Sequence, residues 1–373
     1  MAHSTAALTT AETTGFNADK PLFVVQQATS PNDAHWTTTG KNTGTDVTLS
    51  SEPATRAYDE LGSLVTSSTG VASTSPKYFN FYFATAITID TLVILGHNFN
   101  SIGITSVALE IADNEDFDED VREIAKYTIS GTDDNRILVT NLNGTATTTV
   151  KSCNTNSNTS LTVPSLTSLR IGDLITGAGI PAETYIEAMP GSTEVTMTNA
   201  ASSSLTGIAV TFTQRNYSAS GTPERFSGVQ YARLNIVHSG SKDPEFAEVI
   251  LGRRYQLQRN PDLPYDNKKE YSEVTESRAL SGLVRRYVQY RGQARRSFKA
   301  SMGSSDEITV IEDWWDAIDE GTRPFVYIET PNTAAKAYLM IMESTQLDFP
   351  FVGPIERVLS FSMAEQPRYR ARE

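Results

Sequence analysis

The stretch FSGVQYARLNIVHSGSKDPEFAEVILGRRYQL, residues 226–257, decides how we interpret the rest of the chain. It holds two strand-like runs, residues 228–237 and 246–251, and the Gly, Ser, Asp and Pro residues between them favour a turn. Along the first run an apolar face alternates with a more polar one: Ala232, Leu234 and Ile236 against Arg233, Asn235 and Val237. This pattern predicts a half-buried antiparallel hairpin that completes a β domain formed by the preceding residues.

Composition limits the kinds of partner. The chain has 373 residues, enough for at least two domains. It carries 31 basic and 44 acidic residues, a net charge of -13, whereas nucleic-acid binders need an excess of Lys and Arg. We therefore expect no nucleic-acid partner. The single cysteine, Cys153, excludes an intrachain disulfide framework and most cysteine-ligated metal sites, and we expect no cofactor.

The sequence predicts neither an N-terminal export signal nor a membrane-spanning segment. Residues 1–17 lack a basic start and a long apolar core. The most apolar window, residues 84–95, is far shorter than the ~20 residues that cross a bilayer.

Residues 1–20 are rich in Ala, Thr and Ser, and such a composition buries too little surface to fold alone. We interpret them as an arm that is either flexible or bridges to a neighbouring subunit.

Aromatic and β-branched runs predict the strands of the first β domain. They cover residues 77–83, where Phe79, Phe81 and Phe83 alternate with more polar residues, then residues 87–95 and 107–112. The acidic stretch 113–120 suits a hard cation such as calcium, but it lacks the turn glycine of an EF-hand loop. A solvated loop, with Phe117 inserted into the core, is the favoured interpretation, and calcium binding remains the alternative.

A change of composition marks an insertion at residues 145–214. This segment is dominated by Thr, Ser, Asn and small apolar residues, and it interrupts a β domain that spans residues 21–144 and 215–257. Its centre contains turn glycines at Gly177 and Gly179 that lack the Lys-Ser/Thr and helix start of a phosphate-binding loop. We therefore expect a small β module.

The C-terminal third has a different charge. Residues 258–272, with two prolines, predict a linker, residues 273–366 a β-rich domain with one helix, and residues 367–373 a tail. Ser304 and Glu307 form a capping-box pattern, and Ile308, Ile311, Trp315 and Ile318 share one helical face. Trp314 is then expected to face solvent or a partner subunit.

Basic residues are dense in this part of the chain, so we expect either a solvated strand face or an interface with acidic surfaces of neighbouring subunits. The candidate interface residues are Arg285, Arg286, Arg291, Arg295, Arg296 and Trp314.

Three parts of the chain resemble modules of tailed-bacteriophage proteins. The aromatic strand, TIDTLVILGHNF (residues 88–99), YARLNI (231–236) and FAEVILGR (246–253) resemble a discoidin-like, galactose-binding-type jelly roll of phage tail proteins. The insertion is similar to a small β module of phage tail, fibre and bacterial surface proteins in Gly172, Asp173, Gly177, Gly179, Ile180, Pro181 and Thr184, whereas Glu183 replaces a usual glycine. Residues 273–366 resemble a domain of minor tail and distal-tail proteins.

These resemblances imply a mainly β, multi-domain fold: a jelly-roll β-sandwich interrupted by a small β module and followed by a β-rich domain with one helix. They also imply a structural, ring-forming subunit near the tail tip or baseplate, assembled in the host cytoplasm, with copies of itself and other tail proteins as partners. The alternative is a carbohydrate-binding module of a fibre that recognises a host surface glycan, with Trp36 as a candidate sugar contact. We expect no enzyme, because the four histidines lack metal-ligand spacing.

Overall fold

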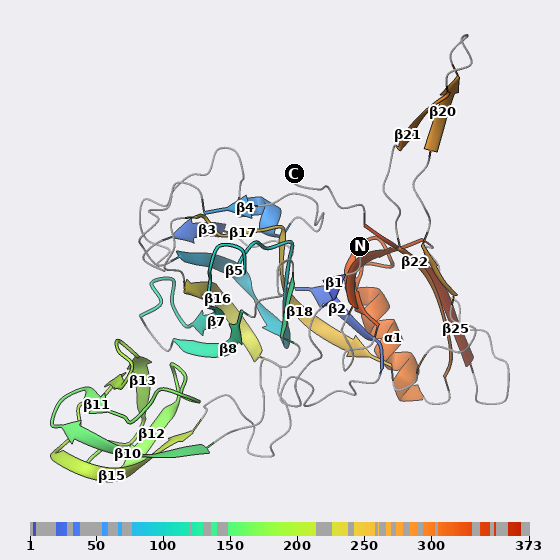
Figure 1. The fold of residues 1–373 in the computed structure, drawn as a ribbon. Helices are drawn as coiled ribbons and strands as arrows, with labels where there is room; N and C mark the ends of the chain where they lie inside the picture. Colours follow the sequence, from blue (N-terminus) through green and yellow to red (C-terminus); the bar gives the residue numbers. More distant parts are fainter. Residues whose placement is uncertain are drawn as a thin grey trace.

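The computed structural model describes residues 3–4, 20–27, 33–37, 54–58, 66–68, 77–118, 121–129, 136–139, 148–213, 226–237, 242–257, 260, 266–269, 274–278, 284–288, 294–302, 305–329, 336–343, 347 and 357–366. These residues form antiparallel β-sheets, one α-helix and the short 3-10 helix η1 (Ala54–Ala57) (Figure 1). The prediction of a mainly β, multi-domain chain with one helix is confirmed.

A sandwich of two sheets occupies the middle of the molecule (Figure 1). Its first sheet has five strands in the order β3 (Asp33–Thr37), β5 (Lys77–Ile89), β16 (Phe226–Val237), β7 (Ser106–Ala112) and β8 (Arg122–Thr128). The expected alternation is confirmed, because Ala232, Leu234 and Ile236 are buried while Arg233 and Asn235 are only partly covered. A separate two-strand pair, β4 (Thr66–Ser67) with β17 (Glu245–Phe246), accompanies this sheet.

The second sheet runs through both the sandwich and the C-terminal half of the chain. Nine of its ten strands follow the order β19 (Asp266–Lys269), β22 (Ala294–Met302), β25 (Arg357–Glu365), β24 (Lys336–Met342), β23 (Phe325–Ile328), β2 (Leu22–Gln26), β18 (Glu248–Gln256), β6 (Thr91–Leu95) and β9 (Arg136–Val139), and β1 (His3–Ser4) pairs with β24. Strand β2 therefore joins the two halves, because it pairs with β18 on one side and β23 on the other. Residues 266–269, expected in a linker, form its edge strand.

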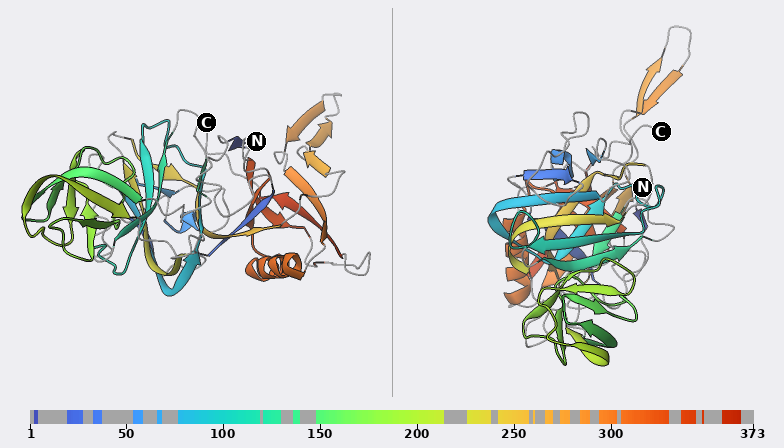
Figure 2. Two further views of the ribbon diagram at one scale, coloured as in Figure 1. Left: turned by 90° about the horizontal axis from the view of Figure 1, so that it is seen from below. Right: turned by 90° about the vertical axis from the view of Figure 1, so that its left-hand side faces the viewer.

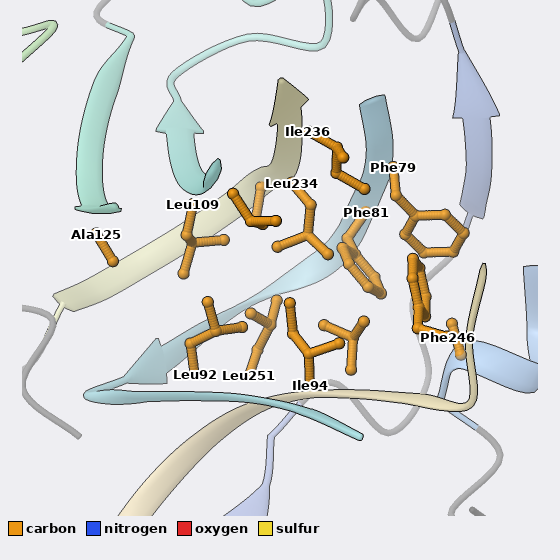
Figure 3. Close-up of a cluster of buried hydrophobic side chains, with 14 of the residues drawn as sticks. Phe79, Phe81, Leu92, Ile94, Leu109, Ala125, Leu234, Ile236, Phe246 and Leu251 are labelled. Atoms are coloured by element: carbon orange, nitrogen blue, oxygen red, sulfur yellow. The ribbon is translucent and has the colours of Figure 1, made fainter. Parts of the chain in front are cut away.

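One face of this long sheet carries two hydrophobic cores. Along β18, Val249 and Leu251 pack into the core beneath the five-stranded sheet, and Tyr255, further along the same face, packs into the core beneath the helix. Figure 3 shows the first core, with Phe79, Phe81 and Leu234 above and Leu92, Ile94 and Leu251 below. The opposite face carries a third buried cluster: Leu22, Val24, Val93, Leu95, Ile250, Val326, Ile328, Ala337 and Leu339.

The hairpin expected from residues 226–257 does not form. β16 pairs with β5 and β7, whereas β18 pairs with β2 and β6, so the two runs lie in opposite sheets. The chain crosses between the sheets there, and the apolar faces of both runs meet in one core. The same holds for residues 77–95: β5 continues to Ile89, and after a turn at Asp90, whose carboxylate accepts hydrogen bonds from Arg254 N and Thr91 Oγ1, β6 enters the other sheet.

The insertion folds into a closed barrel. Its strands follow the order β10 (Thr148–Asn156), β11 (Ser160–Thr162), β14 (Glu194–Met197), β13 (Thr184–Ala188), β12 (Leu174–Gly177) and β15 (Ser204–Thr213). The barrel has its own core, which includes Leu161, Ile175 and Phe212. The start of the first strand and the end of the last strand are paired, with Thr148 opposite Thr213. Glu183, in the place of a usual glycine of the similar module, has a φ of 55°, a conformation that favours glycine.

The helix α1 (Ser305–Ala317) packs with a different tryptophan from the one expected. Trp314 is fully buried together with Ile311 and Ile318, whereas Trp315 is only partly buried. Either tryptophan can share a helical face with Ile311 and Ile318, because both sets of positions fit the helical period. Trp314 is the one that contacts Phe23 of β2, at a distance of 4.8 Å between ring centroids. Ser304, the proposed capping residue, lies outside the described residues.

A two-stranded hairpin projects from the C-terminal half. It consists of β20 (Val274–Arg278) and β21 (Val284–Val288), which pair only with each other among the described strands. Figures 1 and 2 show that it extends away from the rest of the molecule.

Candidate functional site

Trp36 is not available for a sugar. Its side chain is only 1% exposed, and its Nε1 donates a hydrogen bond to Thr66 Oγ1 at 3.2 Å. Its ring lies 5.1 Å from the rings of both Phe79 and Phe246, between the two sheets. The prediction of a sugar contact at Trp36 is therefore wrong, because an aromatic residue that alternates with polar neighbours in a strand is used as core here.

The basic residues proposed for an interface divide into two groups. Arg296 is buried, with its Nη2 donating to Tyr338 Oη at 3.1 Å, and Arg295 pairs with Glu343 at 2.9 Å. Both cations are used within the chain, so the expectation that Arg296 lies at an interface is wrong. The same correction holds for Trp314, which packs in the core beneath the helix.

The remaining basic candidates lie on or near the projecting hairpin. In the β20–β21 register, Arg285 lies opposite Ser277 and Arg286 opposite Glu276. Arg291 lies outside the described residues. The hairpin therefore places adjacent arginines on a strand far from both hydrophobic cores, and their role at an interface stays a prediction.

A buried polar cluster occupies the outer face of the five-stranded sheet. Glu110 of β7 is fully buried and accepts hydrogen bonds from Arg233 Nε at 2.6 Å and from Asn235 Nδ2 at 2.8 Å. The Arg233 guanidinium also lies over the rings of Tyr78, at 4.8 Å, and Phe117, at 4.3 Å. Charge-assisted bonds and ring contacts together compensate the burial of this ion pair.

The acidic loop after β7 closes over that cluster. Phe117 is buried, as expected, with a φ of 52°, but it contacts the Arg233 guanidinium on the outer face of the sheet. The side chains of Asn114 and Asp118 hydrogen bond to each other, and Asp118 N donates to Asn114 Oδ1 at 3.2 Å. Within the described residues no group of three or more His, Cys, Asp or Glu side chains is arranged to hold a metal ion.

The barrel contacts the edge of the five-stranded sheet next to this cluster. The backbone N–H of Glu123 in β8 donates to Ile171 O, in the turn before β12, at 3.0 Å. Gly172 in the same turn has a φ of 89°, and a Cβ at this position would lie 2.8 Å from Arg122 Cγ and 3.0 Å from Val121 O. Glycine is therefore required for both the turn and the close approach of the two backbones.

Two carboxyl groups at this contact have raised pKa values. Burial raises the pKa of Glu123 to about 7, against the smaller opposing effect of Lys126, whose Nζ lies 3.9 Å from Glu123 Oε2. Burial also raises the pKa of Asp173 to about 6, although Asp173 Oδ2 accepts a hydrogen bond from Arg170 N at 2.9 Å. No local pattern predicts this contact, because Glu123 lies far along the chain from residues 170–173.

The single cysteine shows no activation as a nucleophile. Cys153 is buried in the barrel core, and burial raises the pKa of its thiol to about 11. A reactive cysteine needs the opposite shift, toward the thiolate.

Comparisons with known proteins add no assignment. Neither a model of a known protein family nor a curated protein matches this chain. No helix among the described residues is long and apolar enough to cross a membrane.

Proposed function

We propose that this protein is a structural subunit of a tailed-phage virion, a ring-forming tail-tip or baseplate protein that joins the tail tube to receptor-binding parts. The observation that carries the proposal is the projecting hairpin β20–β21 (Figure 1). An isolated two-stranded hairpin is at best marginally stable in water, so a partner surface that covers it would stabilise it. A subunit that assembles with copies of itself supplies such a surface.

The charge of the hairpin region supports an assembly with acidic neighbours. Residues 266–299 contain nine Lys or Arg and four Asp or Glu residues, whereas the whole chain has a net charge of -13. The other parts of a second copy are therefore strongly acidic, and opposite charges would favour a head-to-tail contact. A head-to-tail contact closes into a ring when its rotation permits.

The position of strand β2 suits a subunit that must transmit load. Because β2 pairs with strands of both halves, the sandwich and the helix-covered half share one hydrogen-bonded sheet. Their relative orientation is fixed by a ladder of backbone bonds rather than by a linker. A ring component that joins two other parts of a tail benefits from that rigidity.

The double variant Arg285→Glu with Arg286→Glu tests this proposal. It reverses the charge of β21, so we expect the oligomer measured by light scattering and analytical ultracentrifugation to dissociate. The same assay at low and high salt should show weaker association at high salt, because exposed charges are screened. Lys126→Glu with Lys242→Glu is a matched control, since it makes the same charge change at two exposed positions outside the basic hairpin region.

Two results would count against the proposal. A parent protein that stays monomeric at all concentrations, and forms no rings in electron micrographs, has no ring-forming activity of its own. An oligomer that the double variant leaves intact does not depend on the charge of the hairpin.

A further inference from the structure

The contact between the barrel and the sandwich is small and contains a buried carboxyl group. On the barrel side it is made by the 169–173 turn, and on the sandwich side by the edge strand β8. The bond from Glu123 N to Ile171 O covers part of β8, which is the edge strand of this sheet among the described strands. The barrel has its own core, so it does not need this contact to fold.

The Glu123 carboxyl is buried near this contact, within the electrostatic reach of Arg170 and Asp173 of the turn. Its side chain is 4% exposed, and its Oε1 has no hydrogen-bond partner. The charged groups that act on it are Lys126 of β8 and Arg170 of the turn, which favour its ionised form, and Glu110 of β7 and Asp173 of the turn, which oppose it. Burial outweighs the two cations, so the carboxyl stays mainly neutral below about pH 7 and is half ionised near that pH.

We infer that the 169–173 turn is a latch that holds the barrel against β8 while the Glu123 carboxyl is protonated, and that ionisation of this carboxyl releases the barrel. Leaving a charged carboxylate in this contact is unfavourable because neither Lys126 nor Arg170 donates a hydrogen bond to it in the structure. Separation of the barrel exposes the carboxylate to water and removes that penalty. The barrel would then move about its two side-by-side connections at Thr148 and Thr213.

The direction of the pH effect follows from the two protonation states. Glu123 has a pKa of about 7 in the latched chain and an ordinary value of 4.5 when exposed to water. The latched state therefore binds more protons, its stability is fully present below the ordinary value, and it is lost as the pH rises through the latched value. Between about pH 5 and about pH 8, ionisation of this carboxyl should weaken the latch by about tenfold or more.

Spin labels on the two bodies test this inference in the full chain. Val150 on the barrel and Val237 on the sandwich are both exposed, so cysteines can replace them with little cost, and the native Cys153 is buried with a raised pKa. We expect a narrow distance distribution by electron double resonance at about pH 5 and a broader one at about pH 8. Glu123→Gln, a neutral side chain of the same shape, should remove most of this difference. Glu115→Gln, the same change at an exposed position, should preserve it.

Identical distributions at both pH values in the parent chain would overturn the inference, and so would a Glu123→Gln variant that broadens as the parent does. Hydrogen exchange covers the case in which Glu123→Gln fails to fold. In the unsubstituted protein the protection of the Glu123 amide should fall by about tenfold or more between about pH 5 and about pH 8, after correction for intrinsic exchange. Unchanged protection of this amide would equally reject the latch.

Discussion

Phe23→Ala tests whether the sandwich and the helix-covered half unfold as one unit. Phe23 belongs to strand β2 and is fully buried beneath the helix, where its ring lies 4.8 Å from Trp314 and 5.5 Å from Tyr327. Removing a buried phenylalanine costs about 3–5 kcal/mol, a large part of the ~5–15 kcal/mol net stability of a domain. Loss of the ring contacts with Trp314 and Tyr327 places the expected cost in the upper part of that range.

The tryptophans provide a separate reporter for each half. Trp36 lies in the core of the sandwich, and Trp314 and Trp315 lie in or beside the core beneath the helix. Urea unfolding followed by fluorescence in a Trp36→Phe background reports on the helix-covered half, and a Trp314→Phe, Trp315→Phe background reports on the sandwich. Because β2 is paired with both halves, we expect Phe23→Ala to lower both transition midpoints together.

A matched substitution in the barrel separates this effect from general destabilisation. Phe212 is also a buried phenylalanine, but it lies in the barrel core. Phe212→Ala should leave both tryptophan transitions unchanged. Our reasoning fails if Phe23→Ala moves the Trp314 and Trp315 signal and leaves the Trp36 transition in place, because the shared sheet would then not couple the two halves.

Four further predictions concern single features. Trp314→Ala should lower the free energy of unfolding by about 3–5 kcal/mol and Trp315→Ala by clearly less, as measured by denaturant titration, because only Trp314 is fully buried. Deleting residues 148–213 and joining the ends with a short Gly-Ser linker should leave cooperative tryptophan unfolding, because Thr148 and Thr213 are paired neighbours. Glu183→Gly should increase the free energy of unfolding of the barrel by up to about 1 kcal/mol and raise its thermal midpoint, because glycine adopts the positive φ of this position without steric strain. Cys153 should resist thiol reagents at neutral pH in the folded chain and react fully in urea.

The patterns along individual strands were predictable from the sequence. The alternation of Phe79, Phe81 and Phe83 and that of Ala232, Leu234 and Ile236 give the buried faces that the structure shows. Period-two burial is set within each strand by the direction of successive side chains, so a single sequence carries it. The Thr- and Ser-rich composition of residues 145–214 likewise indicated a separate module, and this segment contains the closed barrel.

The partners of those strands were not predictable. Two apolar runs separated by a turn can bury their apolar faces in two ways: as neighbouring strands of one sheet, or as strands in the two opposing sheets of a sandwich. For β16 and β18 the second arrangement holds, because β5 and β7 occupy both edges of β16. The bond between β2 and β23 joins residues about three hundred positions apart, and no local pattern of residues 22–26 indicates it.

Residue type alone could not separate the arginines that bind groups within the chain from those on the projecting hairpin. Arg295 and Arg296 were grouped with the hairpin arginines because they share a basic stretch, yet β22 is the strand next to the edge of the large sheet, and there Arg296 turns toward Tyr338 beneath the helix. Arg285 and Arg286 differ only in lying on β21, which has no third strand and no helix beside it among the described elements. Arg285 and Arg286 therefore carry the assembly test, because acidic surfaces of a neighbouring subunit would attract the basic hairpin.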